Sequence, residues 1–158
     1  MAHEKEEKTL IILKPDAVHR GLMGEVISRF EKKGLKIIGV KMVELEDVLI
    51  DAHYAHIKDK PFFAGIKNYM KQAPVVVMAL SGIDAVAATR VIVGPTKGSE
   101  APAGTIRGDF SLSMQSNLVH ASDGIEAAAE EVARFFKPEE LFDYARNDFN
   151  FVNAEEVF

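Results

Sequence analysis

Apolar residues of this chain gather in four short runs that predict β-strands. The runs are Thr9–Lys14 (TLIILK), Leu35–Leu45 (LKIIGVKMVEL), Pro74–Leu80 (PVVVMAL) and Leu118–Ser122 (LVHAS). The first three are rich in Ile, Val and Leu, and the first stops at a proline, as a buried strand does where it enters a turn.

Between these runs, apolar residues recur at helical spacing. Leu22, Val26 and Phe30 follow one another every four residues until Gly34, which predicts a helix that ends at this glycine. The other predicted helices are Asp47 to about Lys58, Phe62 to about Gln72, Asp84–Val93 and Asp123–Phe136, the first two being separated by Pro61.

The order of these elements is strand, helix, strand, two helices, strand, helix, strand. It predicts an α+β fold, the ferredoxin-like split βαβ sandwich, in which helices cover a four-stranded antiparallel sheet. In such a sheet the first and fourth strands are neighbours or nearly so, and their ends are expected to lie close together. A fold of this kind supports many functions and does not indicate one.

Residues 94–116 form a long stretch with little periodicity. Loops of more than about 12–15 residues without regular structure are uncommon in compact domains and usually functional. This one contains GPTKGSEAPAGTIRGDF, Gly94–Phe110. It is not a phosphate-binding P-loop, because the G-x-x-x-x-G-K-[ST] spacing is absent and no strand directly precedes it.

Composition limits the class of protein. The 158 residues fit one domain spanning residues 1–158, in which the charged residues 1–7 are expected to be a frayed tail. The net charge of −5 argues against a general nucleic-acid binder, and no apolar run reaches the roughly 20 residues of a membrane-spanning helix. The absence of cysteine fits a reducing compartment, so a cytoplasmic location is expected.

His120 is the candidate reactive residue among five histidines. It falls on the short fourth strand, between an irregular loop and the start of a helix, where scaffolds present reactive groups. Taken alone, a histidine in an apolar run is more often structural. His53 and His56 are spaced for one helix face and could bind a metal, but this pair lacks a third ligand.

The final helix offers a carboxylate to His120. A core stripe of Ile125, Ala129, Val132 and Phe136 is expected on this helix, with Glu131 at the edge of the stripe. A carboxylate that holds one imidazole nitrogen fixes the tautomer and leaves the other nitrogen free to attack. The alternative for Glu131, taken alone, is a solvated surface acid.

Cationic and neutral donors could surround the same histidine. Lys14 ends the first strand, Arg90 precedes the long loop, and the loop region holds the donors Thr96, Arg107 and Asn117. If these side chains converge, they form a donor-rich pocket suited to a triphosphate.

Four segments together resemble the nucleoside diphosphate kinase family over nearly the whole chain. They are TLIILKPDAVHRGLMGEVISRFEKKG, HYAHIKDKPFF, the Gly94–Phe110 loop with GTIRGDF, and NLVHASD followed by the glutamate-bearing helix. The resemblance implies transfer of a γ-phosphate from a nucleoside triphosphate to a nucleoside diphosphate by a ping-pong route, with low base specificity.

The resemblance also implies roles for individual residues. His120 is the nucleophile and becomes a pros-phosphohistidine, Tyr54 and Glu131 hold it in place, and Ser122 lies beside it. Phe62 stacks on the base, with Ile66 and Met114 as apolar walls. The phosphates and sugar hydroxyls are bound by Lys14, Arg90, Thr96, Arg107 and Asn117, of which Lys14 and Asn117 also serve the ribose.

The family implies a cofactor and an assembly as well. Mg²⁺ arrives with the nucleotide, so no protein ligand is expected for it. A homo-oligomer is expected, and the tail after Lys137 favours a hexamer over a tetramer; no nucleic acid or membrane is required. In the loop, Gly94-Pro95-Thr96-Lys97-Gly98 departs from the family's common G-x-T-N-P, and the lost proline leaves the rigidity of the loop open.

Two other functions remain open from the sequence. A non-catalytic nucleotide-binding module on the same fold would bind a diphosphate without becoming phosphorylated. A single-strand nucleic-acid binder would need aromatic side chains on its strands and a basic surface. The strands carry Ile, Val and Met instead.

Overall fold

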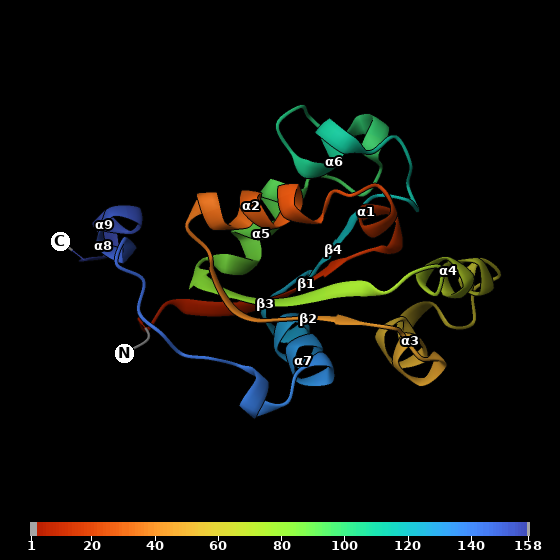
Figure 1. Cartoon of the computed structure of the whole chain (residues 1–158), viewed down its shortest axis with the longest axis horizontal. Coiled ribbons are helices and arrows are strands. Elements are labelled where there is room, and N and C mark those ends of the chain that lie inside the picture. The colour runs from red at the N-terminus through yellow and green to blue at the C-terminus, as the bar shows by residue number, and fades with distance from the viewer. Residues whose placement is uncertain (1–2, 158) are drawn as a thin grey trace.

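A four-stranded antiparallel sheet lies at the centre of the computed structural model, which describes residues 3–157 (Figure 1). The strand order is β2-β3-β1-β4, with each neighbouring pair antiparallel. The strands are β1 Glu6–Leu13, β2 Lys36–Val43, β3 Val75–Ile83 and β4 Val119–Ala121. The predicted ferredoxin-like α+β arrangement is confirmed, and β1 pairs with β4 as expected.

Helices cover both faces of this sheet. Helices α2 and α5 lie over one face, and α7 lies on the other (Figure 1). The α-helices are α1 Pro15–His19, α2 Met23–Lys33, α3 Asp47–His53, α4 Phe63–Met70, α5 Ala85–Val93, α6 Ile106–Phe110, α7 Ile125–Phe135, α8 Phe149–Val152 and α9 Ala154–Val157. Single 3₁₀ turns are η1 Ala55–Ile57, η2 Gly98–Glu100 and η3 Pro138–Glu140.

Strand β1 is buried on both faces, and its alternation divides the core in two. Ile11 and Leu13 pack with Phe30 of α2, whereas Leu10 and Ile12 pack with Val132 of α7. Side chains directly opposite each other in an antiparallel pair share a face. Because His120 pairs with Ile12, its imidazole lies on the α7 side of the sheet.

The first strand starts earlier than predicted. It begins at Glu6, so residues 6 and 7 of the expected frayed tail belong to the sheet. The Glu6 carboxylate accepts a hydrogen bond from Ser81 Oγ and pairs with Lys36, which gives this charged residue a place on the strand. Met1 and Ala2, also in the predicted tail, lie outside the described residues.

Helix α7 is rotated relative to the prediction. Ile125 and Ala129, expected in the core stripe, are exposed, and the buried positions are Ala128, Glu131, Val132 and Phe135. This i, i+3, i+4, i+7 pattern is that of a helix packed on a sheet, with one carboxylate included in the buried face. Two polar partners of Glu131, His120 on β4 and Ser122 directly after it, compensate for its burial.

The long loop is more regular than predicted. It contains η2 and the five-residue helix α6, whose N-cap Thr105 accepts a hydrogen bond from Gly108 N at 2.9 Å. Helix α1, which the sequence pattern showed only as a turn after Pro15, is also present. Among the described residues, no helix is both long and apolar enough to cross a membrane.

Candidate active site

The His120 imidazole is held on one side by a buried carboxylate. Its Nε2 lies 2.7 Å from Glu131 Oε1, and Ser122 Oγ donates to Glu131 Oε2 at 2.6 Å. The carboxylate accepts both bonds, so Nε2 carries a proton, and whenever the ring holds a single proton Nδ1 keeps its lone pair. Among residues 3–157, no hydrogen bond reaches Nδ1 of His120. The histidine is therefore oriented with one nitrogen available for chemistry.

Glu131 stays ionised in this position. Burial alone would raise its pKa, but the hydrogen bonds from His120 and Ser122 outweigh burial and lower the pKa below its usual value. Its side chain is 11% exposed. The edge position predicted from the helical wheel is thus a core-facing position, and the predicted contact with His120 is made.

A second histidine, His53, packs against His120. The two rings meet edge to face with centroids 4.6 Å apart, and Tyr54 packs against His53 in turn at 4.9 Å. Burial, followed by the neighbouring His120, lowers the pKa of His53 to about 3, so this ring is neutral. His56 is exposed, so the two histidines do not share an environment. Tyr54, predicted to hold His120, packs against His53, and His53 packs against His120.

His53 has a cationic partner that the sequence did not suggest. Arg134 Nη1 lies 3.2 Å from His53 Nδ1, and Phe135 packs edge-on against the same ring at 5.3 Å. A guanidinium can only donate, so Nδ1 of His53 accepts. The i, i+3 spacing of His53 and His56 did not indicate the contacts with Arg134 and Phe135, because these come from α7, about 80 residues away.

Lys14 reaches the site from the end of β1. Its Nζ donates to Asn117 Oδ1 at 2.6 Å, and Asn117 Nδ2 donates to the carbonyl oxygens of Thr96 and Met114 at 2.9 and 3.0 Å. Burial, with the nearby charge of Arg107, lowers the pKa of Lys14 to about 8. Four predicted site residues, Lys14, Thr96, Met114 and Asn117, are therefore joined in one network.

Arg107 is a buried cation, only 4% exposed. Its guanidinium donates to the carbonyl oxygens of Gly94, Asn117 and Val119 at 2.9, 3.2 and 2.6 Å. Burial and the adjacent Arg90 lower its pKa to about 10. Arg107 thus ties the start of the long loop to the strand that bears His120.

Arg90 and the predicted base-binding residues complete the set. Arg90 lies 3.0 Å from the Asp123 carboxylate and 3.4 Å from the Ala121 carbonyl oxygen, so it borders β4. Phe62 and Met114 are exposed by 55% and 65%. Ile66 packs on the edge of the core on α4, and Gln115 Nε2 donates to Gly65 O at 3.4 Å, which connects α4 to the segment of Met114.

Asp16 supports the site and was missed by the sequence analysis. Its carboxylate accepts from Tyr69 Oη and from Leu118 N, the latter at 3.0 Å. Leu118 has a φ of +73°, a left-handed conformation that is unfavourable for a branched side chain. Asp16 therefore holds a strained turn between Asn117 and β4. The only sequence signal was its place in LKPD.

The departure in the loop has a packing explanation. A Cβ atom at Gly98 would overlap Ser111, and Gly98 N donates to Ser113 O at 3.0 Å. Lys97 pairs with Glu100 at 2.7 Å across the turn. Close backbone packing at Gly98 therefore closes this loop where the family's proline is absent.

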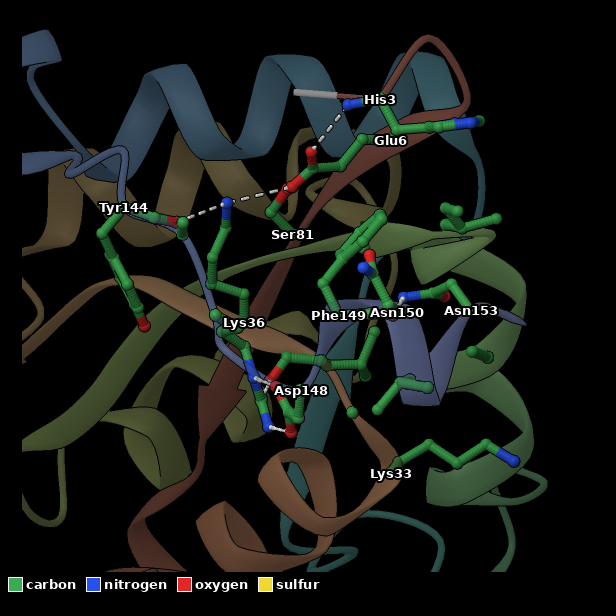
Figure 2. A pocket seen from close by; sticks show the side chains of 18 of the residues that line it. His3, Glu6, Lys33, Lys36, Ser81, Tyr144, Asp148, Phe149, Asn150 and Asn153 are labelled. Carbon is green, nitrogen blue, oxygen red and sulfur yellow. Dashed lines mark hydrogen bonds and ion pairs between the residues drawn. The ribbon is translucent and has the colours of Figure 1, made fainter. Parts of the chain in front are cut away.

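A large hollow lies elsewhere and takes in none of the predicted site residues. It measures about 1020 Å³ and is lined by residues of both termini, β2 and β3, among them Lys36, Tyr144, Asp148 and Phe149 (Figure 2). The cluster around His120 has the chemistry instead: an oriented imidazole beside the buried cation Arg107 and the half-buried cation Lys14, which suits transfer of an anionic group.

Comparison with known proteins agrees with this geometry. The family model described as nucleoside diphosphate kinase matches residues 7–141. The nucleoside diphosphate kinase of Parabacteroides distasonis is 51% identical over 152 residues, covering 96% of this chain and 99% of that protein. Human nucleoside diphosphate kinase A is 46% identical over 138 residues, with 87% and 91% covered.

Solved structures give the same result. A halophilic nucleoside diphosphate kinase from Halobacterium salinarum, in complex with CDP, superposes with a TM-score of 0.91 at 40% identity, covering 93% of this chain and 98% of that one. The enzyme from Borrelia burgdorferi, in a transition-state mimic with vanadate and ADP, gives 0.89 at 33% identity, with 94% and 98% covered. This chain belongs to the nucleoside diphosphate kinase family.

Proposed function

We propose that this phosphotransferase works in two half-reactions through Nδ1 of His120. In the first, the lone pair of Nδ1 attacks the γ-phosphorus of a nucleoside triphosphate; an N–P bond forms, the P–O bond to the β-phosphate breaks, and a diphosphate leaves. In the second, a β-phosphate oxygen of another nucleoside diphosphate attacks the same phosphorus and the N–P bond breaks. The observation that carries this proposal is the 2.7 Å contact of Nε2 with Glu131, which leaves Nδ1 unengaged.

Glu131 and Ser122 position the nucleophile in this scheme. When Nδ1 gains the phosphoryl group, the imidazole acquires positive character, and the ionised Glu131 at Nε2–H stabilises it. The proton on Nε2 remains there in both half-reactions, so no separate general base is needed. Tyr54 supports the ring through His53.

The cations serve the phosphates. Phosphoryl transfer has a loose transition state, so catalysis consists of alignment and charge stabilisation, which buried donors supply well. In the proposal Lys14, Arg90, Thr96, Arg107 and Asn117 bind phosphates or sugar hydroxyls. The base stacks on exposed Phe62 between Ile66 and Met114, and stacking accepts any base, which accounts for low base specificity.

Mg²⁺ would accompany the nucleotide. The two carboxylates nearest the cations are already engaged: Asp16 by Tyr69 and Leu118, and Asp123 by Arg90. This donor set fits an ion held by phosphate oxygens and water rather than by the protein. Its chemistry is to neutralise phosphate charge.

The proposed enzyme is one domain of residues 1–158 that acts in the cytoplasm as a homo-oligomer, a hexamer in preference to a tetramer. Exposed Val40 and Met42, at 55% and 53%, lie on the edge strand β2 and support association. Light scattering of the purified chain would measure the subunit number, and a monomer at micromolar concentration would contradict this part.

The central experiment is labelling with γ-³²P-ATP and Mg²⁺. The wild-type chain should yield an acid-labile, alkali-stable phosphoprotein that passes its label to GDP. His120→Ala should lose both labelling and transfer, by about 10³-fold or more. If ADP binds but no label appears on the wild type, the chain is a non-catalytic nucleotide-binding module; if His120→Ala is still labelled at the same site, another residue is the nucleophile.

A further inference from the structure

Three side chains behind the reactive face of His120 form a compact donor set. His53, His120 and Glu131 each offer one ligand atom, and these atoms lie within 4.8 Å of one another. Two imidazoles and one carboxylate are a typical set for Zn²⁺ and related first-row metals. The proposed phosphoryl transfer does not use this set as a ligand cage.

The distances fit a metal ion after small adjustments. His120 Nε2 is 2.7 Å from Glu131 Oε1, and His53 Nδ1 is 3.9 Å from the same oxygen. Donor atoms bonded to tetrahedral zinc at about 2.0–2.1 Å lie roughly 3.3 Å apart, so the His120–Glu131 distance must lengthen and the His53–Glu131 distance must shorten by roughly half an ångström. The donor atoms of His53 and His120, which lie within 4.8 Å of each other, must approach by at most about 1.5 Å. Side-chain torsions can supply such shifts. A water molecule could complete the coordination, since His120 is 19% exposed.

The present occupants of these atoms can be displaced. On His120, the metal would take the place of the Nε2 proton that now faces Glu131. On His53, Nδ1 has a lone pair that accepts from Arg134 at 3.2 Å. Arg134 is only partly buried, so its guanidinium can turn toward solvent.

We propose that His53, His120 and Glu131 form an inhibitory transition-metal site, filled by Zn²⁺ or an ion of similar preference. The inhibitory effect rests on the proposed role of His120 as nucleophile. A neutral imidazole carries one N–H. When Nε2 binds the metal, it releases its proton to solvent, and Nδ1 takes up a proton from solvent. The ring therefore still carries one proton, now on Nδ1. Nδ1 then has no lone pair to attack phosphorus, so the metal-bound enzyme cannot be phosphorylated.

The first test uses the wild-type chain without nucleotide. Titration with Zn²⁺ alone should show one tight site per chain, and Co²⁺ should give the visible absorption of a four-coordinate ion. Long-range ¹H–¹⁵N spectra should show the proton of His120 moving from Nε2 to Nδ1. If the Nε2–H tautomer persists at saturating Zn²⁺, the proposal is wrong. This readout needs no variant and no activity.

Matched variants locate the site. His53→Gln should weaken Zn²⁺ binding at least tenfold, whereas the same change at exposed His56 should leave it unaltered. Arg134→Ala should strengthen binding several-fold, because the guanidinium no longer competes for Nδ1 of His53. Equal weakening by His53→Gln and His56→Gln would overturn the assignment, since binding would then belong to the helix-face pair.

The activity arm separates this proposal from the proposed function. Enzyme loaded with Zn²⁺, freed of excess ion and then given Mg-ATP should be labelled at least tenfold more slowly, and a chelator should restore the rate. Labelling unaffected by bound Zn²⁺ would refute inhibition while leaving the kinase intact. If Zn²⁺ binds and moves the His120 proton to Nδ1, but ATP never labels the chain, the proposed kinase activity is wrong and the proposed metal site stands.

Discussion

Lysine and arginine side chains in two regions of this molecule have different partners: carboxylates in one region, and neutral amide or carbonyl oxygens in the other. Around the hollow at the chain termini, Lys36 pairs with Glu6 at 3.2 Å and with Asp143 at 3.6 Å, and Arg146 pairs with Asp148 (Figure 2). Around His120, Lys14 and Arg107 contact amide and carbonyl oxygens, and no ion pair within residues 3–157 involves either.

We infer that the paired cations have a structural role, whereas Lys14 and Arg107 bind a ligand. A paired surface cation contributes little to stability, whereas a buried cation without a carboxylate costs free energy that the fold must supply elsewhere. The lowered pKa values of Lys14 and Arg107 reflect this free-energy cost, because burial disfavours the charged form of each side chain. We infer that a phosphate supplies the missing negative charge. Five predictions can break or sharpen this contrast.

The largest effect is expected at Lys14. Lys14→Met should lower kcat/KM by about 10²–10³-fold, as loss of one donor to a transition-state anion does. It should also raise the free energy of unfolding by about 1–3 kcal/mol, because a desolvated charge disappears. Urea unfolding and steady-state kinetics measure the two together. A variant that is both less active and less stable would show that Lys14 is structural.

Lys14→Arg is the matched control for charge. It keeps the positive charge but replaces a compact ammonium by a planar fork that must displace Asn117. Turnover should still fall clearly. Near-wild-type kinetics would place Lys14 away from the transferring phosphate.

Glu131→Gln tests whether the negative charge beside His120 Nε2 contributes to the reaction. The amide can still accept from His120 Nε2 and meet Ser122, so packing is kept while the negative charge is lost. Turnover should fall about 10²-fold, at the low end of the range for loss of a group that stabilises a developing charge. Single-turnover phosphorylation rates are the measurement. An unchanged rate would mean that the hydrogen bond matters and the charge does not.

The pH dependence should follow Lys14. Its pKa of about 8 in the free chain means that the ammonium is present below that pH and lost above it. Thus kcat/KM should fall about tenfold per pH unit well above pH 8. Stability should move the opposite way: between pH 8 and the ordinary lysine pKa the unfolded chain binds more protons, so the free energy of unfolding contributed by Lys14 rises with pH. A flat profile to pH 10 would contradict the lowered pKa.

The smallest effect is expected in the paired region. Arg146→Met removes the pair with Asp148 and the hydrogen bond to Leu35 O, and should lower the free energy of unfolding by about 1 kcal/mol or less. Kinetic constants should remain within twofold of the wild type. A tenfold loss of turnover would connect the hollow to catalysis and remove the distinction drawn between the two regions.

The fold was accessible to sequence analysis because three strands are nearly unbroken apolar runs and β1 is buried on both faces. The pairing of His120 with Glu131 was accessible too, since both lie on adjacent elements eleven residues apart. The rotation of α7 was not, because a helical wheel assigns glutamate to the polar side and cannot weigh the two hydrogen bonds that hold Glu131 inward.

Long-range contacts account for the rest. His53 meets His120 across 67 positions of the sequence, and Asp16 meets Leu118 across 102, so no local pattern reports either contact. The left-handed backbone conformation of Leu118 is likewise not predictable from its residue type, because leucine usually indicates only a core position. Such features depend on which elements the topology brings together.

The short strand β4 has a consequence for synthesis of the chain. It joins β1 by only three residue pairs, and its partner residues, Ile12 and His120, are separated by 108 positions. Loop closure over such a distance comes after the local β2–β3 pairing. A nascent chain on the ribosome can therefore form much of its sheet while the histidine is still in the exit tunnel. Release of the last forty residues thus sets the moment at which the site around His120 can form, and a product truncated before α7 lacks both Glu131 and the core side chains Val132 and Phe135.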